Sequence, residues 1–203
     1  MTDTSGADSV PEHERAHEAL VEDPHLGPVV GEHEPVTIDP AEDLFERLVV
    51  SLVRQQVSMD AAAAIRERLF DAFEISPEAM LAADPGGLHA VGLSEAKAEY
   101  VQATARAFRD RGYDREYFAG MDDERVAAEL TEIRGVGPWT AKMVLVFGLG
   151  RPDVFPVEDL GIRKGMTEVF DDGDLTRAEM RDRAAAWEPY RSYASLYLWR
   201  AVD

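Results

Sequence analysis

The sequence predicts an all-α fold built from about ten helices. Three observations support this prediction. Apolar residues recur at helical spacing in most segments, Ser, Thr or Asp precedes many of these segments as an N-cap signal, and no run alternates as a strand would. With 203 residues, the chain is long enough to bury a sizeable core.

The first part of the chain is polar. Residues 1–11 are predicted to be a flexible tail, because they lack the apolar residues that a packed segment needs. Residues 12–22 are expected to form a short acidic helix with Ala16, Ala19 and Leu20 facing inward.

A strongly apolar helix follows. Asp39 is a candidate N-cap, with Pro40 in the first turn. The inward stripe consists of Leu44, Phe45, Leu48, Val49 and Leu52. The segment 54–58, Arg-Gln-Gln-Val-Ser, then leads into an Ala-rich helix over 59–73. Two buried glutamine amides would need hydrogen-bond partners. These partners could lie in a helix–helix turn of the protein or in a molecule that it binds.

The middle of the chain contains three more predicted helices. Ser76 caps the first of these, and the segment 91–97 opens a longer one. Asp122 or Asp123 begins the third. The inward residues of the second and third are Ala98, Val101, Ala105, Phe108, Val126, Leu130 and Ile133.

A glycine-rich turn follows Ile133. Gly135 and Gly137 flank one residue, and Pro138 occupies a favoured first position of a helix that is apolar on nearly all sides. Glycine allows positive φ and a close approach of the backbone to another molecule. The backbone amides of Gly135, Gly137 and Thr140, at the positive end of the helix dipole, therefore predict an anion site, for which a nucleic-acid phosphate is the obvious ligand.

Two adjacent acids, Glu158 and Asp159, follow an extended segment about twenty residues later. Taken alone, Asp159 is better explained as the cap of a helix that starts at Leu160. Thr176 then opens a capping box for a helix that ends near Trp187. Pro189 breaks that helix, and an aromatic-rich last helix runs over 189–200.

Composition excludes several classes of protein. The sequence has no cysteine, so disulfides and cysteine-ligated zinc or iron–sulfur centres are excluded. It has no apolar stretch long enough for a membrane span and no signal-peptide pattern, which favours a cytoplasmic location.

The net charge of −19 argues against a nucleic-acid partner, because phosphate binding usually needs a basic surface. Lysine is nearly absent, and the acids outnumber all basic residues. This composition suits a halophilic cytoplasm, where the Debye length falls to roughly 3 Å in molar salt. The alternative is an acidic helical interaction module that never meets DNA.

Residues 130–159 resemble the helix-hairpin-helix motif, Gly/Pro-rich loop and Asp of the helix-hairpin-helix DNA glycosylases. In detail they resemble the DNA-3-methyladenine glycosylase II branch, in a compact form without an N-terminal sheet domain. The resemblance implies one glycosylase domain over 12–203 with two helical lobes and a cleft between them. Residues 12–55 with 150–203 would form one lobe, and residues 56–149 would form the central lobe.

The same resemblance implies roles for the acids and for Trp139. Asp159 corresponds to the essential catalytic Asp, and Glu158 is the weaker candidate. Relatives that also nick DNA carry a Lys where this chain has Trp139, and Lys142 is not the matching position. The expected enzyme is therefore monofunctional: it releases the base without cleaving the strand.

Other site residues follow from the resemblance. Trp139, Met143 and Trp199 would line the pocket for the extruded base. Gln56, together with Gln55, would form the wedge, meaning the loop that enters the duplex at the lesion. No cofactor is required, although the hairpin could hold Na⁺ or K⁺ on the backbone carbonyls of Thr131, Ile133 and Val136.

The implied function is hydrolytic excision of alkylated purines, such as 3-methyladenine and 7-methylguanine, in base excision repair. The expected partner is double-stranded DNA, and the expected state is a monomer. Two alternatives share the fold: a glycosylase for oxidised or deaminated bases, and a non-catalytic hairpin protein that only binds DNA.

Overall fold

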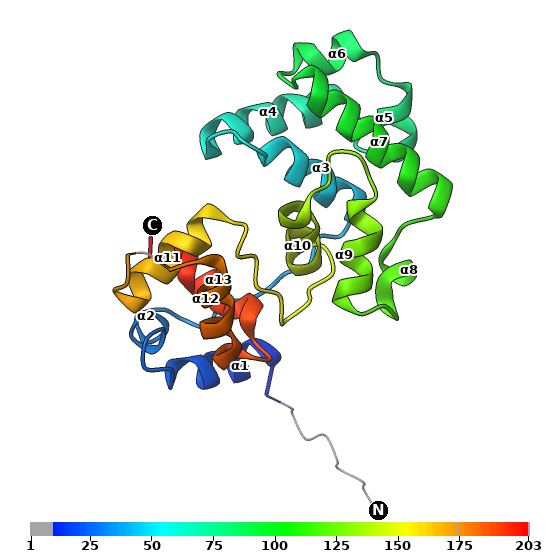
Figure 1. Cartoon of the computed structure of the whole chain (residues 1–203). Coiled ribbons are helices and arrows are strands. Elements are labelled where there is room, and N and C mark those ends of the chain that lie inside the picture. The colour runs from blue at the N-terminus through cyan, green and yellow to red at the C-terminus, as the bar shows by residue number, and fades with distance from the viewer. Residues whose placement is uncertain (1–9, 174, 203) are drawn as a thin grey trace, which may run out of the picture. The chain divides into compact units, whose positions relative to one another are not determined.

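A computed structural model describes residues 10–173 and 175–202. In that part of the chain it contains thirteen α-helices, one short 3₁₀ helix and no strand (Figure 1), so the all-α prediction is confirmed. The number of helices exceeds the predicted ten. The extra helices include α2 (Gly27–Gly31), α6 (Pro85–Ala90) and α8 (Arg115–Ala119), which are too short to show a periodic apolar stripe.

The chain divides into two compact units. The terminal unit comprises Met1–Ile38 and Val157–Asp203, and the central unit comprises Asp39–Pro156. This boundary differs from the expected one, because residues 39–55 and 150–156 group with the central helices. The reason is packing: α3 (Leu44–Arg54) lies against both α7 (Glu95–Arg111) and α10 (Pro138–Phe147).

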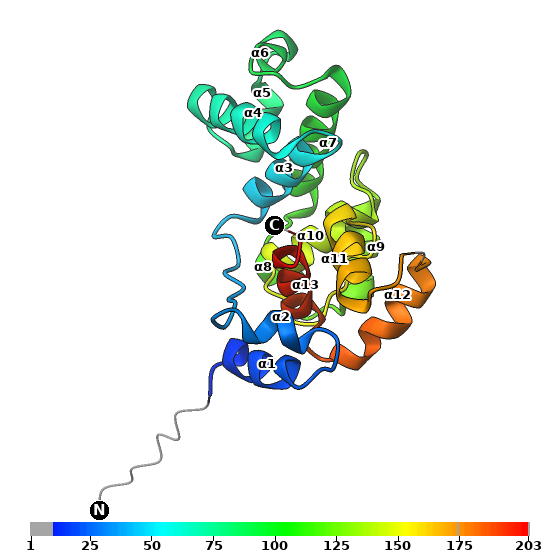
Figure 2. The ribbon, with the colours of Figure 1, turned by 90° about the vertical axis from the view of Figure 1, so that its left-hand side faces the viewer.

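The terminal unit is organised around its last helix, α13 (Arg191–Arg200). Figure 2 shows α13 beside α11 (Leu160–Phe170), and α13 also contacts α1 (Glu12–Val21) and α2. Gly165 on α11 permits this close packing, because a Cβ there would lie 2.9 Å from the carbonyl carbon of Leu198. The unit is completed by α12 (Arg177–Ala184) and the 3₁₀ helix η1 (Ala185–Trp187).

Buried aromatic residues tie the first and last segments of this unit together. The Tyr197 hydroxyl accepts from the amide of Val36 at 3.2 Å and lies 2.7 Å from Nδ1 of His17. Trp187 donates to Asp23 at 3.0 Å. The predicted inward face of α1 is confirmed for Ala16 and Leu20 but is wrong for Ala19, which is exposed on a helix of only ten residues.

The central unit holds the remaining helices. Besides α3, α6, α7, α8 and α10, they are α4 (Met59–Ala72), α5 (Pro77–Ala82) and α9 (Asp123–Thr131). The inward stripes predicted for α3, α7 and α9 are all buried. In this unit α5 and α6 pack on α7, and α9 packs on α10 (Figure 1).

Most predicted caps are confirmed. Ser76 and Asp122 each accept from a backbone amide at a helix start, and Thr176 forms a full capping box with Glu179. Ser94, for which no cap was predicted, does the same at the start of α7. The cap predicted at Asp39 is wrong, because α3 begins at Leu44 and Asp43 caps it by accepting from the Glu46 amide at 2.8 Å. The amide of Ala41 instead donates to the Phe147 carbonyl, so this stretch runs along the end of α10.

Two further predictions concern the helix break at Pro189 and the absence of a membrane-spanning helix. The helical run over α12 and η1 stops at Trp187, and the cis bond Glu188–Pro189 separates it from α13, as the proline predicts. Nowhere in the described residues is there a helix both long enough and apolar enough to cross a membrane.

Candidate functional site

The glycine turn lies between α9 and α10 in the central unit, as predicted. Its apolar residues Ile133 and Val136 are buried, and the Val136 amide donates to the Ile133 carbonyl at 3.0 Å. This bond closes the turn and fixes the direction in which α10 starts. The turn is therefore an ordered element rather than a loose connection.

Both the backbone conformation and the packing of the turn require glycine at position 135. Its φ of 91° belongs to the region that side chains disfavour. A Cβ at this position would also fall on the ring of Tyr100, only 2.5 Å from Cδ1 and from Cδ2. Tyr100 on α7 was not anticipated from the sequence, because nothing in the local pattern signals which ring a turn will pack on.

Gly137 differs from Gly135. Its φ and ψ of −99° and 178° are extended, so the expectation of positive φ holds only for Gly135. A Cβ at Gly137 would meet no protein atom within 4 Å. Nothing inside the described protein demands a glycine here, and the backbone at this position is open to an approaching molecule.

The start of α10 lacks a side-chain cap. Gly137 is the N-cap residue and Pro138 is the first helical residue, as predicted. By contrast, Asp or Ser caps α3 to α9. Uncapped helix starts leave donors and partial positive charge available, which suits an anion.

The two glutamines have different environments. Gln55 Nε2 donates to the Gly135 carbonyl at 2.9 Å and to Oγ1 of Thr140 at 2.8 Å. Gln55 therefore joins the end of α3 to the turn and to the first turn of α10. Gln56 is exposed and has a φ of 56°, a left-handed conformation that non-glycine residues rarely adopt.

Lys97 supports the same region from α7. Its Nζ donates to the Val53 carbonyl at 2.6 Å, which satisfies one of the last carbonyls of α3. Partial burial lowers the pKa of this amine. The segment 91–97, which opens α7 as predicted, thus also supports the end of α3.

The helix α10 carries Trp139, Met143 and Lys142, which have different environments. Trp139 is half-buried, whereas Met143 is only 3% exposed and belongs to the core of the central unit. Lys142 Nζ donates to the Phe155 carbonyl at 3.0 Å. The ammonium of Lys142 is therefore engaged in holding the extended segment that follows α10.

The three carbonyls expected to hold a monovalent cation lie in the same turn. The Ile133 carbonyl already accepts from Val136, but a carbonyl oxygen has a second lone pair. The donor set at Thr131, Ile133 and Val136 is therefore compatible with Na⁺ or K⁺, and the ion stays a prediction.

Asp159 lies in the terminal unit at the start of α11. Its Oδ1 accepts from the Ile162 amide at 3.0 Å, so Asp159 is indeed an N-cap. The same oxygen accepts from Nε1 of Trp199 at 3.0 Å. The structure thus brings together the predicted acid and one of the predicted aromatic residues, forty positions apart in the chain.

Gly161 makes this contact possible. A Cβ on Gly161 would lie 2.7 Å from Cδ1 of Trp199 and 3.1 Å from Oδ1 of Asp159. Any side chain at position 161 would therefore push the indole and the carboxylate apart. Sequence reasoning missed Gly161; its place in the first turn of a helix, where glycine is unfavourable, was the available signal.

Arg163 fixes the backbone that carries Asp159. Its Nη1 donates to the carbonyls of Val157, Glu158 and Asp159 at 3.3, 2.6 and 3.3 Å. The Glu158 carboxylate instead lies 3.6 Å from Arg181, in an ion pair. The two adjacent acids are thus distinguished, because Glu158 pairs with α12 and Asp159 is oriented by Trp199.

Comparison with known proteins extends this description. The Bacillus subtilis protein named "Putative DNA-3-methyladenine glycosylase YfjP" is 32% identical over 188 residues, covering 88% of this chain and 66% of that protein. The DNA-3-methyladenine glycosylase of Saccharomyces cerevisiae is 32% identical over 208 residues, covering 91% and 68%. The chain thus spans about two thirds of the length of these relatives.

A solved structure and a family model agree with these relatives. The 3-methyladenine DNA glycosylase Mag1 of Schizosaccharomyces pombe, solved in complex with abasic DNA, matches with a TM-score of 0.83 at 28% identity. The match covers 92% of this chain and 95% of that one. The model of the HhH-GPD superfamily of base excision DNA repair proteins matches residues 49–189, which include both the glycine turn and Asp159. The chain therefore belongs to the HhH-GPD superfamily.

Proposed function

We propose that the chain is a monofunctional DNA glycosylase that excises alkylated purines, of the 3-methyladenine and 7-methylguanine type, from double-stranded DNA. The observation that carries this proposal is the Asp159 carboxylate, held by the Ile162 amide and the Trp199 indole in a member of the HhH-GPD superfamily. The names of its relatives favour alkylated purines as the substrate class.

The proposed reaction needs a fixed negative charge. As the bond between the base and the sugar breaks, the base leaves with the bonding electrons and positive charge develops on the deoxyribose. The Asp159 carboxylate stabilises that charge, and it orients or deprotonates the water that attacks C1′. The products are a free base and an abasic site.

An aromatic pocket suits a cationic base. Alkylated purines such as 3-methyladenine carry positive charge, and an indole face attracts a cation by about 0.5–2 kcal/mol. Trp199 is proposed to stack on the extruded base beside Asp159, and Trp139 is proposed to do so from α10. Met143, one helical turn after Trp139 on α10, is proposed to line the same pocket from its buried position.

The proposed enzyme has no lyase activity, because α10 presents no free lysine at the required position. Trp139 occupies the position from which a lysine amine would attack C1′. The Lys142 ammonium is bound to the Phe155 carbonyl, which makes it a poor substitute. No covalent adduct should therefore be trapped by borohydride.

The central unit is proposed to bind the DNA backbone and to open the duplex. The uncapped start of α10, with the amides of Gly135, Gly137 and Thr140, would bind a phosphate. The exposed, left-handed Gln56 would be the tip of the wedge, since strained conformations cluster at functional sites. Gln55 would be the anchor that holds this tip to the turn.

The proposed enzyme works without a cofactor and without a partner subunit. No cofactor is required beyond an optional Na⁺ or K⁺ at the hairpin carbonyls. The protein is proposed to act as a monomer on DNA in a cytoplasm of high salt, near the nucleoid.

The decisive experiment measures base release from alkylated DNA in high salt by the wild type and by Asp159→Asn. Asparagine caps helices as well as aspartate does and keeps an oxygen for Trp199. The variant should therefore fold and bind DNA, yet lose base release by roughly 100-fold or more, since one fixed charge at a reacting centre is worth about 3 kcal/mol.

Asp122→Asn is the matched control, because Asp122 caps α9 in the same way, by accepting from the Arg125 amide at 2.7 Å. Base release by this control should equal that of the wild type. Full turnover by Asp159→Asn would end the catalytic assignment. Release from uracil, hypoxanthine or 8-oxoguanine duplexes but not from alkylated DNA would instead favour the alternative substrates. Binding without any release would favour a non-catalytic hairpin protein.

A further inference from the structure

A pocket of about 400 Å³ lies in the central unit beside the turn that joins α3 to α4. Its walls come from both helices and include Val50, Val53, Ala62 and Ala63. Arg54 and Met59 flank the segment 55–58 and also line the pocket. The pocket is therefore next to the Gln55–Gln56 pair but distinct from the glycine turn.

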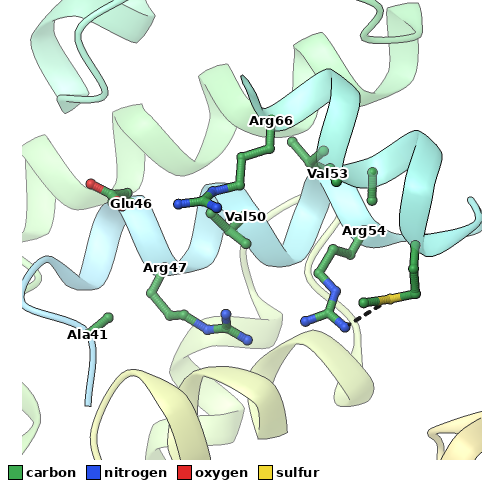
Figure 3. Close-up of a pocket in the computed structure, with 10 residues that line it drawn as sticks. Ala41, Glu46, Arg47, Val50, Val53, Arg54 and Arg66 are labelled. Carbon is green, nitrogen blue, oxygen red and sulfur yellow. Dashed lines mark hydrogen bonds between the residues drawn. The ribbon is translucent and has the colours of Figure 1, made fainter. Parts of the chain in front are cut away.

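Three arginines converge on this pocket. Arg47 and Arg54 are seven residues apart on α3 and so share one face of the helix, while Arg66 comes from α4. Figure 3 shows their guanidinium groups turned toward the same hollow, with Val50 on its wall. A cluster of this kind is unexpected in a chain with a net charge of −19.

These guanidinium groups have apolar rather than acidic neighbours. Arg47 lies 4.8 Å from the ring centre of Phe147, Arg66 lies 4.9 Å from that of Phe70, and Arg54 donates to Sδ of Met59 at 3.2 Å. Glu46 also lines the pocket, yet within the described residues no ion pair joins it to any of the three.

Arg47 is the most constrained of the three. Its Nε is buried and has no hydrogen-bond partner among the described residues. Burial, followed by repulsion from Arg54 and Arg66, lowers the pKa of Arg47 to about 10. A bound anion would remove both penalties, because it pairs with the buried charge and screens it from its neighbours.

The chemistry of the pocket selects a phosphate attached to an apolar group. Guanidinium forks match the oxygens of a phosphate, and aliphatic walls suit a sugar. Arg54 directly precedes Gln55, so a strand opened at Gln56 would pass close to the pocket.

We propose that Arg47, Arg54 and Arg66 form a second phosphate site for the DNA backbone, beside the wedge and separate from the hairpin. This inference rests on the proposed function, since it takes the bound molecule to be DNA. It explains how an acidic chain can hold DNA: positive charge is concentrated where the strand is gripped.

The test is the salt dependence of binding to an undamaged fluorescent duplex, followed by anisotropy. The variant Arg54→Gln with Arg66→Gln spares Arg47, whose stem is packed. Because each lost phosphate contact reduces the slope of log Kd against log salt by about 0.9, the slope should become shallower by roughly 1–2. Affinity at low salt should fall roughly tenfold.

The matched control is Arg106→Gln with Arg109→Gln, which removes the same charge from exposed positions on α7 of the same unit. Its slope should remain that of the wild type. Equal slopes for both double variants, with both folded by circular dichroism, would overturn the proposal.

A second arm separates DNA from free phosphate. Inorganic phosphate is added during thermal unfolding of the wild type and the pocket variant. Stabilisation of the wild type by phosphate together with an unchanged DNA slope would mean a small-anion site and would refute the DNA assignment. If the wild type released no base while the slope still became shallower in the pocket variant, the proposed function would be refuted and the phosphate site would stand, so the two failures can be told apart.

Discussion

At the scale of single residues, the terminal unit shows how one side chain serves the fold and the proposed chemistry together. Asp159 caps α11 and accepts from Trp199 with the same oxygen. The resemblance to the glycosylase family indicated Asp159 and Trp199 separately, as the catalytic acid and as a pocket residue. Their contact depends on how α13 packs on α11, which local spacing does not encode.

The two glycines of the turn give a prediction at this scale. Gly135→Ala should destabilise the protein by about 3 kcal/mol, because it combines a positive φ with overlap on the Tyr100 ring. Gly137→Ala should lower the free energy of unfolding far less than Gly135→Ala but weaken DNA binding, because its methyl group would project into the space proposed for a phosphate.

Denaturant unfolding and duplex binding measure these two effects. Each variant serves as the control for the other. Equal stability of the two variants would contradict the assigned roles, as would undiminished DNA affinity of Gly137→Ala.

The glutamines and Gly161 show what sequence alone leaves open. The pair at 55–56 was identified as a unit, since amides need partners. Only the structure separates an anchored Gln55 from an exposed Gln56. The role of Gly161 could not be predicted because Trp199, which it contacts in space, is far away in the sequence.

At the scale of helices, caps and apolar stripes were predicted well because they depend on nearby residues. Ser76, Asp122 and Thr176 are confirmed. The failure at Asp39 has a longer-range cause, since the Ala41 amide binds the end of α10 instead of starting a helix. Tertiary contacts therefore place the cap of α3 at Asp43, four residues beyond the predicted one.

A buried acid links α9 to the segment that follows α7. Glu129 accepts from the Tyr113 hydroxyl at 2.8 Å and pairs with Arg125 at 2.6 Å. The hydrogen bond from Tyr113, helped by Arg125, lowers the pKa of Glu129. Since α9 leads into the glycine turn, this link steadies the proposed phosphate site.

Glu129→Gln should therefore be less stable near neutral pH, by about 1 kcal/mol or roughly 2–4 °C in Tm. A depressed carboxylate pKa adds stability above the ordinary value of about 4.3 and loses it as the pH falls through the lower folded value. The difference from the wild type should thus shrink in acid.

Thermal unfolding across a pH series measures this effect. Glu132→Gln is the control. Glu132 is likewise ion-paired, with Arg111 at 2.7 Å, but its side chain is exposed. A Tm difference for Glu129→Gln that is constant with pH would show that packing, not charge, accounts for its role.

At the scale of the whole molecule, the sequence correctly predicted the fold class and the family, because the hairpin is a compact motif of 30 residues or so whose residue types follow from its geometry. The expected lobe boundary differs from the observed units, since α3 packs with α7 and α10 of the central unit. Which helices share a unit is a property of packing faces and not of chain order.

The charge of the molecule supports a prediction about salt. With 40 acidic and 21 basic residues, repulsion should destabilise the folded state in dilute buffer. Molar KCl should therefore raise Tm by several degrees, because it shortens the Debye length to roughly 3 Å.

Sucrose at equal osmolality is the control, since it is excluded from protein surfaces without screening charge. The same Tm gain in sucrose would remove electrostatics as the cause. A Tm that falls with KCl would contradict the high-salt habitat.

The uncapped start of α10 has a consequence for how the free and bound proteins compare. If a DNA phosphate occupies that position, the nucleic acid supplies the terminus that no side chain provides. The substrate would then complete the N-terminus of a helix that is already formed from Pro138 in the free protein.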